Sequence, residues 1–324
     1  FVFTVPIYKK SAFIAGITPY SSLGYDFSHD ITDPALVASA GNINYRSNGE
    51  GSLYQLFLGG GATFWNKLSV GAQFLYYFGN MDKSTSMDFT SASYRDIYSG
   101  YNLNLHAVGG KFGVQYDQAL APGLYMTVGA TYKTSSRLKG RVSDYKYATI
   151  SSQSDTLHYN VDTLSHGSNV KLASEYGVGI ALRKGDKWRI EFDYTRSDWR
   201  NSNFDKTTGF ANVGVSTFST TYSQSFKAGF EIVPNRNDIR YYMRRCSYRA
   251  GMYYDRDYYK LDGNTVNSYG VTLGITLPVF RWYNGISIGV DLGQRGTNTG
   301  NMIRERYAMF VVGFNIHDIW FQKP

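Results

Sequence analysis

Hydrophobic and polar residues alternate with a period of two over many segments of this sequence. The clearest case is 188–195, where four apolar positions (Trp188, Ile190, Phe192, Tyr194) alternate with four polar ones (Arg189, Glu191, Asp193, Thr195). The same alternation occurs in 68–78, 124–133, 225–232 and 286–293. A period of two is typical of β-strands that have one apolar and one polar face. The pattern therefore predicts an all-β protein with about thirteen strands in this chain.

The connections between these segments alternate between short and long. The short ones are 9–11, 65–67, 119–123, 184–186, 235–238 and 280–284. The long ones are rich in Ser, Asp, Asn and Thr and cover 28–43, 81–97, 141–167, 199–217, 256–266 and 296–302. Short turns at one end, long loops at the other and a polar inner face are typical of outer-membrane barrels. We expect a transmembrane, antiparallel, up-and-down β-barrel.

Four tryptophans lie beside the short turns or near the C-terminal end: Trp65, Trp188, Trp282 and Trp320. Aromatic side chains are enriched where a membrane protein meets the membrane–water interface. These four predict a girdle at the periplasmic interface. The expected location is the outer membrane of a Gram-negative bacterium, with short turns periplasmic and long loops extracellular.

The direction of the strands predicts a further strand. If the last strand, 303–317, ends in the periplasm, counting back makes the segment 1–8 start from the outside. Bacterial single-chain barrels have even strand numbers. We therefore expect one strand before Phe1, fourteen strands in the full protein, and a single barrel domain over 1–324.

Composition excludes several other classes. The longest apolar run, 308–314, is far too short for a membrane-spanning helix, and mean hydropathy is −0.33. Cys246 is the only cysteine, which excludes a disulfide scaffold. The net charge of +8 comes from scattered basic residues and not from a basic patch. This distribution predicts contact with anionic outer-membrane lipid and lipopolysaccharide, and no nucleic-acid partner.

The sequence contains little that indicates catalysis. The segment 285–289 matches G-x-S-x-G, but it lies in a strand and not at the strained turn that this motif needs. The five histidines have no metal-ligand spacing. We expect no enzymatic activity, no catalytic residues, no cofactor and no metal.

Several short segments resemble one known family. They are Ile17 to Tyr25, Asn48 to Gly51, Leu68 to Asn80, Asp291 to Thr297 and Asn315 to Phe321. All are similar to the Bacteroidota branch of the FadL/OmpP1/TodX outer-membrane proteins. The resemblance implies a fourteen-stranded barrel that is plugged by an N-terminal hatch and takes up hydrophobic molecules such as fatty acids or aromatic hydrocarbons. The hatch would precede Phe1.

Two groups of residues are candidates for a functional site. Eight charged residues are predicted to face the lumen: Arg189, Glu191, Asp193, Lys227, Glu231, Arg249, Asp291 and Arg295. Their mixed signs favour an ion-paired lumen over a polar conduit or an anchor for a substrate carboxylate. The second group is expected at the outer rim: Tyr253, Tyr254, Asp255, Arg256, Asp257 and Tyr258. It could bind an amphipathic ligand, dock a protein, or form the outer aromatic girdle.

Two functions follow from these patterns. The first is a FadL-like passive channel for a hydrophobic ligand, which predicts a continuous apolar path through the barrel. The alternative is a non-transporting accessory barrel of a larger outer-membrane machine for barrel assembly, protein secretion or surface lipoproteins. It predicts a plugged lumen and outer-membrane protein or lipoprotein partners, with 141–167 and 199–217 as docking surface.

Overall fold

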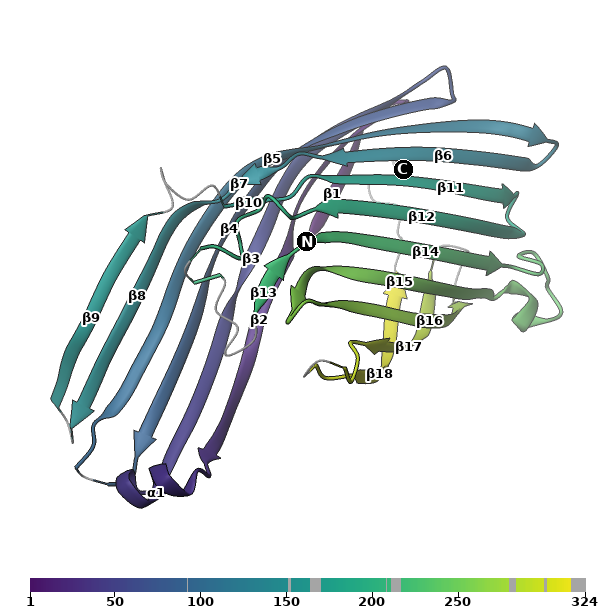
Figure 1. Ribbon diagram of the computed structural model, residues 1–324. Helices are drawn as coiled ribbons and strands as arrows, with labels where there is room; N and C mark the ends of the chain where they lie inside the picture. The colour runs from purple at the N-terminus through teal and green to yellow at the C-terminus, as the bar shows by residue number, and fades with distance from the viewer. Residues whose placement is uncertain are drawn as a thin grey trace, which may run out of the picture.

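One antiparallel sheet dominates the computed structural model, which describes residues 1–91, 93–150, 153–163, 170–207, 209–210, 217–279, 284–299 and 302–315 (Figure 1). Thirteen strands follow one another in a single path: β1 Val2–Tyr8, β2 Ser11–Ile31, β3 Ile43–Phe64, β4 Leu68–Phe89, β5 Asp96–Ala121, β6 Leu124–Lys133, β11 Glu175–Lys184, β12 Trp188–Asp198, β14 Tyr222–Ile232, β15 Ser247–Leu261, β16 Asn264–Pro278, β17 Gly285–Arg295 and β18 Glu305–Asn315. The predicted all-β architecture and strand number are confirmed.

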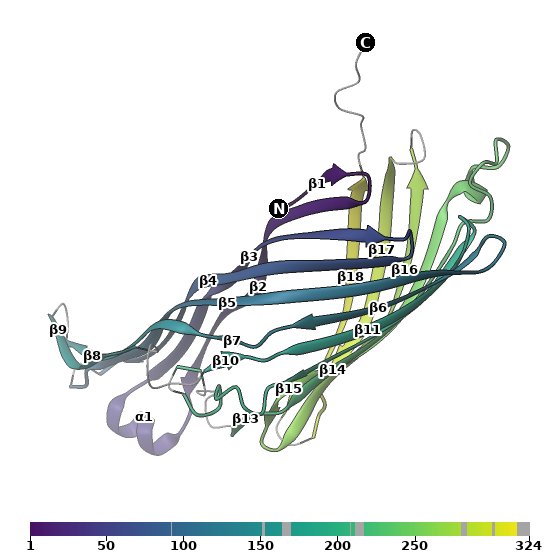
Figure 2. The same cartoon turned by 90° about the horizontal axis from the view of Figure 1, so that it is seen from above.

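The sheet curves around an interior, with β1 and β18 as the two ends of the strand path (Figure 2). Three further strands are joined to it: β8 Lys139–Ile150 pairs with β5, β9 Gln153–Thr163 pairs with β8, and β13 Phe218–Thr220 pairs with β15. The short strands β7 Ser136–Arg137 and β10 Lys171–Leu172 form a separate pair. A fourteenth strand before Phe1 stays a prediction.

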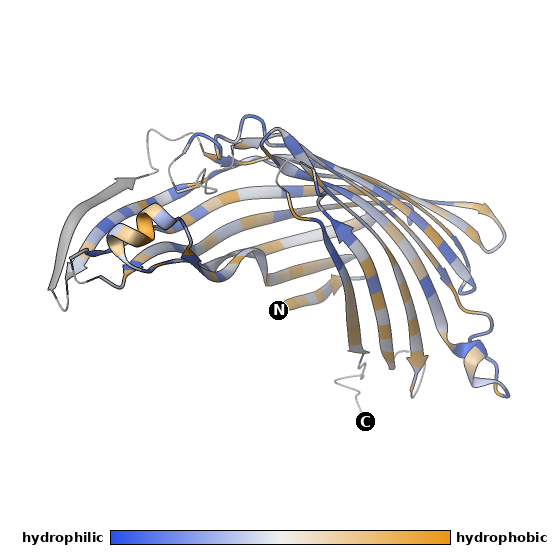
Figure 3. Cartoon of the chain, turned by 60° about the horizontal axis from the view of Figure 1, so that its bottom comes forward, coloured by the Kyte–Doolittle hydropathy of each residue, from blue (hydrophilic) through white to orange (hydrophobic). Residues whose placement is uncertain are grey.

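In β11, β12 and β14 the register gives each strand an apolar outer face and a polar inner face. Ile190 lies opposite Leu182 and Phe230, so apolar side chains adjoin across three strands. The outer apolar residues are well exposed: Phe310 and Phe314 of β18 are 73% and 71% exposed. Figure 3 shows the same alternation as bands along the strands. A continuous apolar outer face is what a lipid environment requires of a barrel. Among the described helices, none is both long and apolar enough to cross a membrane.

Strands β2 to β5 are much longer than predicted, with 21, 22, 22 and 26 residues. About 9–11 residues suffice to cross a membrane, so a large part of each strand extends beyond the span. Figure 1 shows these ends bending away together with β8 and β9. The predicted loop 81–97 is thus largely strand, and so are 141–150 and 153–163 of the predicted loop 141–167, whereas 28–43 consists of the ends of β2 and β3 with a helix over 34–40 between them. The pattern missed them because polar residues here lie on both faces while the backbone ladder continues, as in the cross-strand Arg46–Asp26 ion pair of 2.6 Å.

At the far end of these strands, the helix α1 Pro34–Ala40 joins β2 to β3 (Figure 3). Asp33 caps it, because its Oδ1 accepts a hydrogen bond from the Ala35 amide at 2.9 Å. Pro34 occupies the first turn, where no intrahelical amide donor is needed.

Two other predicted connections are corrected. The expected loop 256–266 is a tight hairpin, in which β15 and β16 are joined by Asp262 and Gly263 at φ +49° and +78°. Asp-Gly is the usual sequence of such a two-residue turn, because both positions need positive φ. The expected short turn 235–238 is instead a connection of 14 residues, 233–246, which contains the 3₁₀ helix η1 Tyr242–Arg245.

Candidate functional site: the barrel interior

The structure places all eight lumen-facing candidates around one chamber of about 1250 Å³: Arg189, Glu191, Asp193, Lys227, Glu231, Arg249, Asp291 and Arg295. They come from β12, β14, β15 and β17, and the period of two brings them to the same face. Arg249 forms an ion pair with Glu231 at 3.3 Å, and Arg189 with Glu191 at 2.7 Å. The Ser247 hydroxyl also donates to Glu231 at 2.7 Å. Paired charges of both signs therefore line this chamber.

The rim candidates lie within β15, and they are divided between its two faces. Tyr253 and Asp255 line the chamber, whereas Tyr254 is on the outer face and 41% exposed. The register of β15 against β16 shifts between Arg256 and Lys260. These residues do not form one binding site at the rim.

The remaining rim residues contact different neighbours. The Arg256 guanidinium lies 4.1 Å from the ring centre of Tyr222. Asp257 forms an ion pair with Arg295 at 2.8 Å. Tyr258 packs against Trp199, with ring centres 4.6 Å apart. The sequence did not predict this last contact, and it belongs to a larger apolar cluster.

Two girdle candidates lie at the short-turn end of the strands. Trp65 is in the β3–β4 turn at φ +48° and is 80% exposed, and Trp188 is the first residue of β12. Trp282 and Trp320 lie outside the described residues.

A densely packed apolar cluster, here called the interior layer, covers the inner face of β3, β4 and β5. Its buried members are each at most 8% exposed: Leu53, Phe57, Leu75, Tyr77, Leu103, Leu105, Ala107, Leu138, Val142, Val170 and Leu172. Partly buried side chains pack against them: Ile14, Tyr20, Met81, Tyr101, Trp199, Phe204 and Phe210. Burial of this completeness is typical of a protein core and not of a wet lumen.

The segment after β12, residues 199–207 and 209–210, folds onto this face and is here called the inner segment. Gly209 has φ +84°, and a Cβ atom there would lie 3.2 Å from Val142 Cγ1, so the chain passes close to β8. The Lys83 ammonium donates to the Gly209 carbonyl at 2.8 Å, and burial lowers the pKa of this lysine. The Lys171 amide also donates to the Ser202 carbonyl at 3.0 Å.

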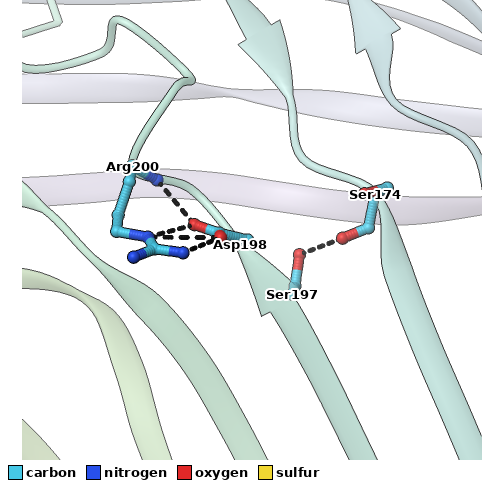
Figure 4. A network of polar contacts seen from close by, with 4 residues as sticks. All are labelled: Ser174, Ser197, Asp198 and Arg200. Atoms are coloured by element: carbon cyan, nitrogen blue, oxygen red, sulfur yellow. Dashed lines mark hydrogen bonds and ion pairs between the residues drawn. The ribbon is translucent and has the colours of Figure 1, made fainter.

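The start of the inner segment is fixed by polar contacts (Figure 4). The Ser197 hydroxyl donates to the Ser174 carbonyl at 2.8 Å, which joins the end of β12 to the residue before β11. Arg200 forms an ion pair with Asp198 at 2.5 Å, and its backbone amide donates to the same carboxylate at 3.2 Å. These contacts direct the chain inward where β12 ends.

The interior layer reaches across the barrel. On one side, the Tyr20 ring of β2 meets Tyr77 edge-to-face at 4.9 Å, and the Lys133 ammonium lies 5.6 Å from the Tyr20 ring centre. On the other side, Trp199 packs against Tyr258 of β15. Side chains from β2 to β15 thus form one connected packing unit. The sequence carried a signal for it, since inward positions such as Leu75 and Leu103 are apolar where a wet lumen would need polar residues.

The catalytic motif considered from the sequence is embedded in a strand. Ser287 lies within β17, and its hydroxyl is 2.9 Å from that of Thr276 on the neighbouring strand. No cluster of three or more His, Cys, Asp or Glu that could hold a metal occurs among the residues that the structure describes.

The model of the BamG family matches this chain over residues 1–324. The chain belongs to the BamG family. No curated protein matches the sequence.

Solved structures identify the fold of this BamG-family chain. The Ralstonia pickettii toluene transporter TbuX matches at TM-score 0.60 and 16% identity, with 98% of this chain and 80% of that chain covered. The P. putida toluene transporter TodX matches at 0.59 and 14%, with 98% and 82% covered. A Pseudomonas aeruginosa FadL homologue matches at 0.50 and 12%, with 91% and 68% covered. The resemblance to FadL-type proteins is confirmed for the fold, whereas the sequence motifs did not identify BamG.

Proposed function

We propose that this protein is a non-transporting accessory barrel of a larger outer-membrane machine. In this proposal the apolar outer face lies in outer-membrane lipid and lipopolysaccharide, the short turns face the periplasm, and the extended strands face the outside. The match to the BamG family model over residues 1–324 supports this accessory role.

The interior layer is the observation that carries this proposal. A channel for hydrophobic molecules needs an apolar path that a ligand can enter. Here the apolar side chains inside the barrel are packed against one another, with Leu75 and Val170 fully buried. Charged side chains of both signs line the chamber beside them, including the Arg189–Glu191 and Arg249–Glu231 ion pairs. An apolar ligand there would deprive these charges of solvation. Neither region offers the environment that such a ligand requires.

The extended ends of β2 to β5, with β8, supply surface for partners. They present polar side chains on a hydrogen-bonded scaffold, including the Arg46–Asp26 pair at 2.6 Å and the hydrogen bond from Asn44 to Asp30 at 2.8 Å. Part of this region was predicted from sequence as a docking loop, 141–167. A rigid sheet binds a partner with less loss of conformational entropy than a flexible loop.

The second candidate is the FadL-like passive channel, which the fold likeness to the toluene transporters TbuX and TodX favours. A transport assay separates the two functions. Full-length protein and TbuX as positive control are reconstituted into vesicles, and the entry of toluene and of a fluorescent fatty acid is measured. The accessory role predicts entry at the rate of empty vesicles. Entry at a rate comparable to that of TbuX would refute it.

A further inference from the structure

The connection between β14 and β15, residues 233–246, is here called the arginine loop. It contains 14 residues, whereas the β3–β4 and β11–β12 turns at the same end contain three each. Figure 3 shows it as a lobe with one short helix beyond the strand ends. Such a length is not needed to join two antiparallel neighbours, which two residues can connect.

Hydrogen bonds hold the arginine loop in one conformation. Asp238 accepts from the backbone amides of Arg240 and Tyr241 at 2.9 and 2.7 Å, and forms an ion pair with Arg244 at 3.3 Å. These donors keep the pKa of Asp238 below its usual value. The Asn235 amide donates to the Arg244 carbonyl at 2.8 Å and closes the loop at its base.

Contacts to neighbouring turns fix the position of the loop. The Val233 amide donates to the Lys187 carbonyl at 2.8 Å, and the Gly185 amide donates to the Gly123 carbonyl at 2.8 Å. The Tyr242 hydroxyl donates to the Pro278 carbonyl at 2.9 Å. Three connections at this end and the end of β16 are therefore linked, and a partner would meet a preformed surface.

The exposed part of the loop combines positive charge with apolar side chains. Arg240 and Arg244 both stack on Tyr241, at 5.3 and 4.9 Å from its ring centre. Ile239 is 100% exposed and Met243 is 55% exposed. The loop has four arginines and one aspartate, which gives a net charge of +3 (four minus one). An adjoining groove of about 570 Å³ is lined in part by Lys184 at the end of β11 and by Lys187 and Asp186 of the β11–β12 turn, and Asp186 forms an ion pair with Arg236 at 3.4 Å.

We propose that the arginine loop is a docking site for an acidic segment of a partner protein, with an apolar side chain of that segment covering Ile239 and Met243. Carboxylates bind the planar guanidinium groups of arginine in a bidentate manner. Arginine and tyrosine with a central apolar anchor are enriched in protein interfaces. The net charge of +3 together with the exposed Ile239 and Met243 favours an occupant that offers both carboxylates and an apolar side chain, as an acidic protein segment does. This inference rests on the proposed accessory role.

Site-specific photo-crosslinking in cells tests the proposal with the full-length protein. A photoreactive residue replaces Ile239, and a control carries it at Asn66, in another turn at the same end. We expect a protein adduct at position 239, with the crosslinked peptide of the partner acidic by mass spectrometry, and at least fivefold less adduct at position 66. Equal adducts at both positions, or a phospholipid adduct alone at position 239, would overturn the proposal.

Reversing the charge of one arginine in the loop provides a second test of the docking site. Arg240 donates to Asp238 through its backbone amide, and its side chain contacts the loop by stacking on Tyr241, which Arg244 also covers. Arg240→Glu therefore keeps the hydrogen bonds of the loop, and heat-modifiable electrophoretic mobility checks that the barrel is folded. The matched control is Arg304→Glu, an exposed arginine before β18 at the other end of the strands. We expect Arg240→Glu to reduce the adduct at least fivefold and Arg304→Glu to leave it unchanged. An unchanged adduct in Arg240→Glu contradicts the docking site.

Native co-purification separates this inference from the proposed function. If wild-type protein retains stoichiometric partners and Arg240→Glu retains the same set in the same amounts, the docking site is wrong and the accessory role stands. If the wild-type protein carries no protein partner, the accessory role itself is refuted.

Discussion

Replacing Leu75 by alanine tests whether the barrel interior is packed as a core. The Leu75 side chain is fully buried within the interior layer. Removing three carbon atoms loses about 2.4 kcal/mol of transfer free energy at ~0.8 kcal/mol per carbon. A residual cavity adds to this, because Leu75 lies on a strand that is hydrogen-bonded on both sides and cannot move inward. We therefore expect a total loss of about 3–5 kcal/mol in the free energy of unfolding.

A lipid-facing leucine is the matched control. Leu273 of β16 is on the outer face and 56% exposed to the surroundings of the protein. Lipid chains can fill the space that its truncation leaves, so Leu273→Ala should cost only the transfer contribution, about 2 kcal/mol or less. The comparison isolates the cavity contribution that a packed interior requires.

The assay is urea unfolding of the protein in lipid vesicles, followed by tryptophan fluorescence, for which Trp199 reports from the interior layer itself. With a slope of about 2–3 kcal/mol per molar urea, the expected loss lowers the midpoint of Leu75→Ala by roughly 1–2.5 M. A midpoint equal to that of Leu273→Ala, or a loss below about 1 kcal/mol, would refute a packed interior and favour an open lumen.

Three further predictions address other parts of the account. Trp199→Ala removes the contact to Tyr258 and should cost about 2–3 kcal/mol, less than a fully buried tryptophan because Trp199 is partly buried. Limited proteolysis should then cut the inner segment faster. Gly263→Ala introduces a side chain at φ +78° and should destabilise the protein by about 1–2 kcal/mol in the same urea assay. The control is Gly24→Ala in β2, which should have little effect because a Cβ atom there meets no atom within 4 Å. Burial lowers the pKa of Lys83, so the folded state releases its proton before the unfolded state does, and stability should rise as the pH increases toward 10.5. Lys83→Met should abolish that rise, and an identical pH dependence in wild type and variant would contradict it.

The strands of the barrel wall could be predicted from the sequence because lipid on the outside and water on the inside impose an alternation with a period of two. This alternation shows which residues of β12, β14 and β17 face outward and which face inward. All eight predicted inward charges line the same chamber for this reason. The strand number follows from counting such segments.

Other features depend on contacts between distant segments, and alternation does not encode those. The long ends of β2 to β5 lie beyond the membrane span, where polar residues occur on both faces and the alternation with a period of two is lost, while the backbone pairing continues. The inner segment reads as a polar loop, yet Trp199 and Phe204 pack onto β3 to β5 from more than ninety residues away in the sequence. The register of β15 shifts between Arg256 and Lys260, and the rim residues Asp257 and Tyr258 lie within this shift. The alternation of residues along β15 therefore does not predict which side chains they contact.

The most direct test of the central claim is native purification of the full-length protein. Tagged protein is extracted from outer membranes in mild detergent, and mass spectrometry measures which proteins and which small molecules remain bound. A non-transporting accessory barrel predicts stoichiometric outer-membrane protein or lipoprotein partners and no hydrophobic ligand in the interior. A lone barrel that carries a fatty acid or an aromatic hydrocarbon would contradict the account and identify the protein as a channel.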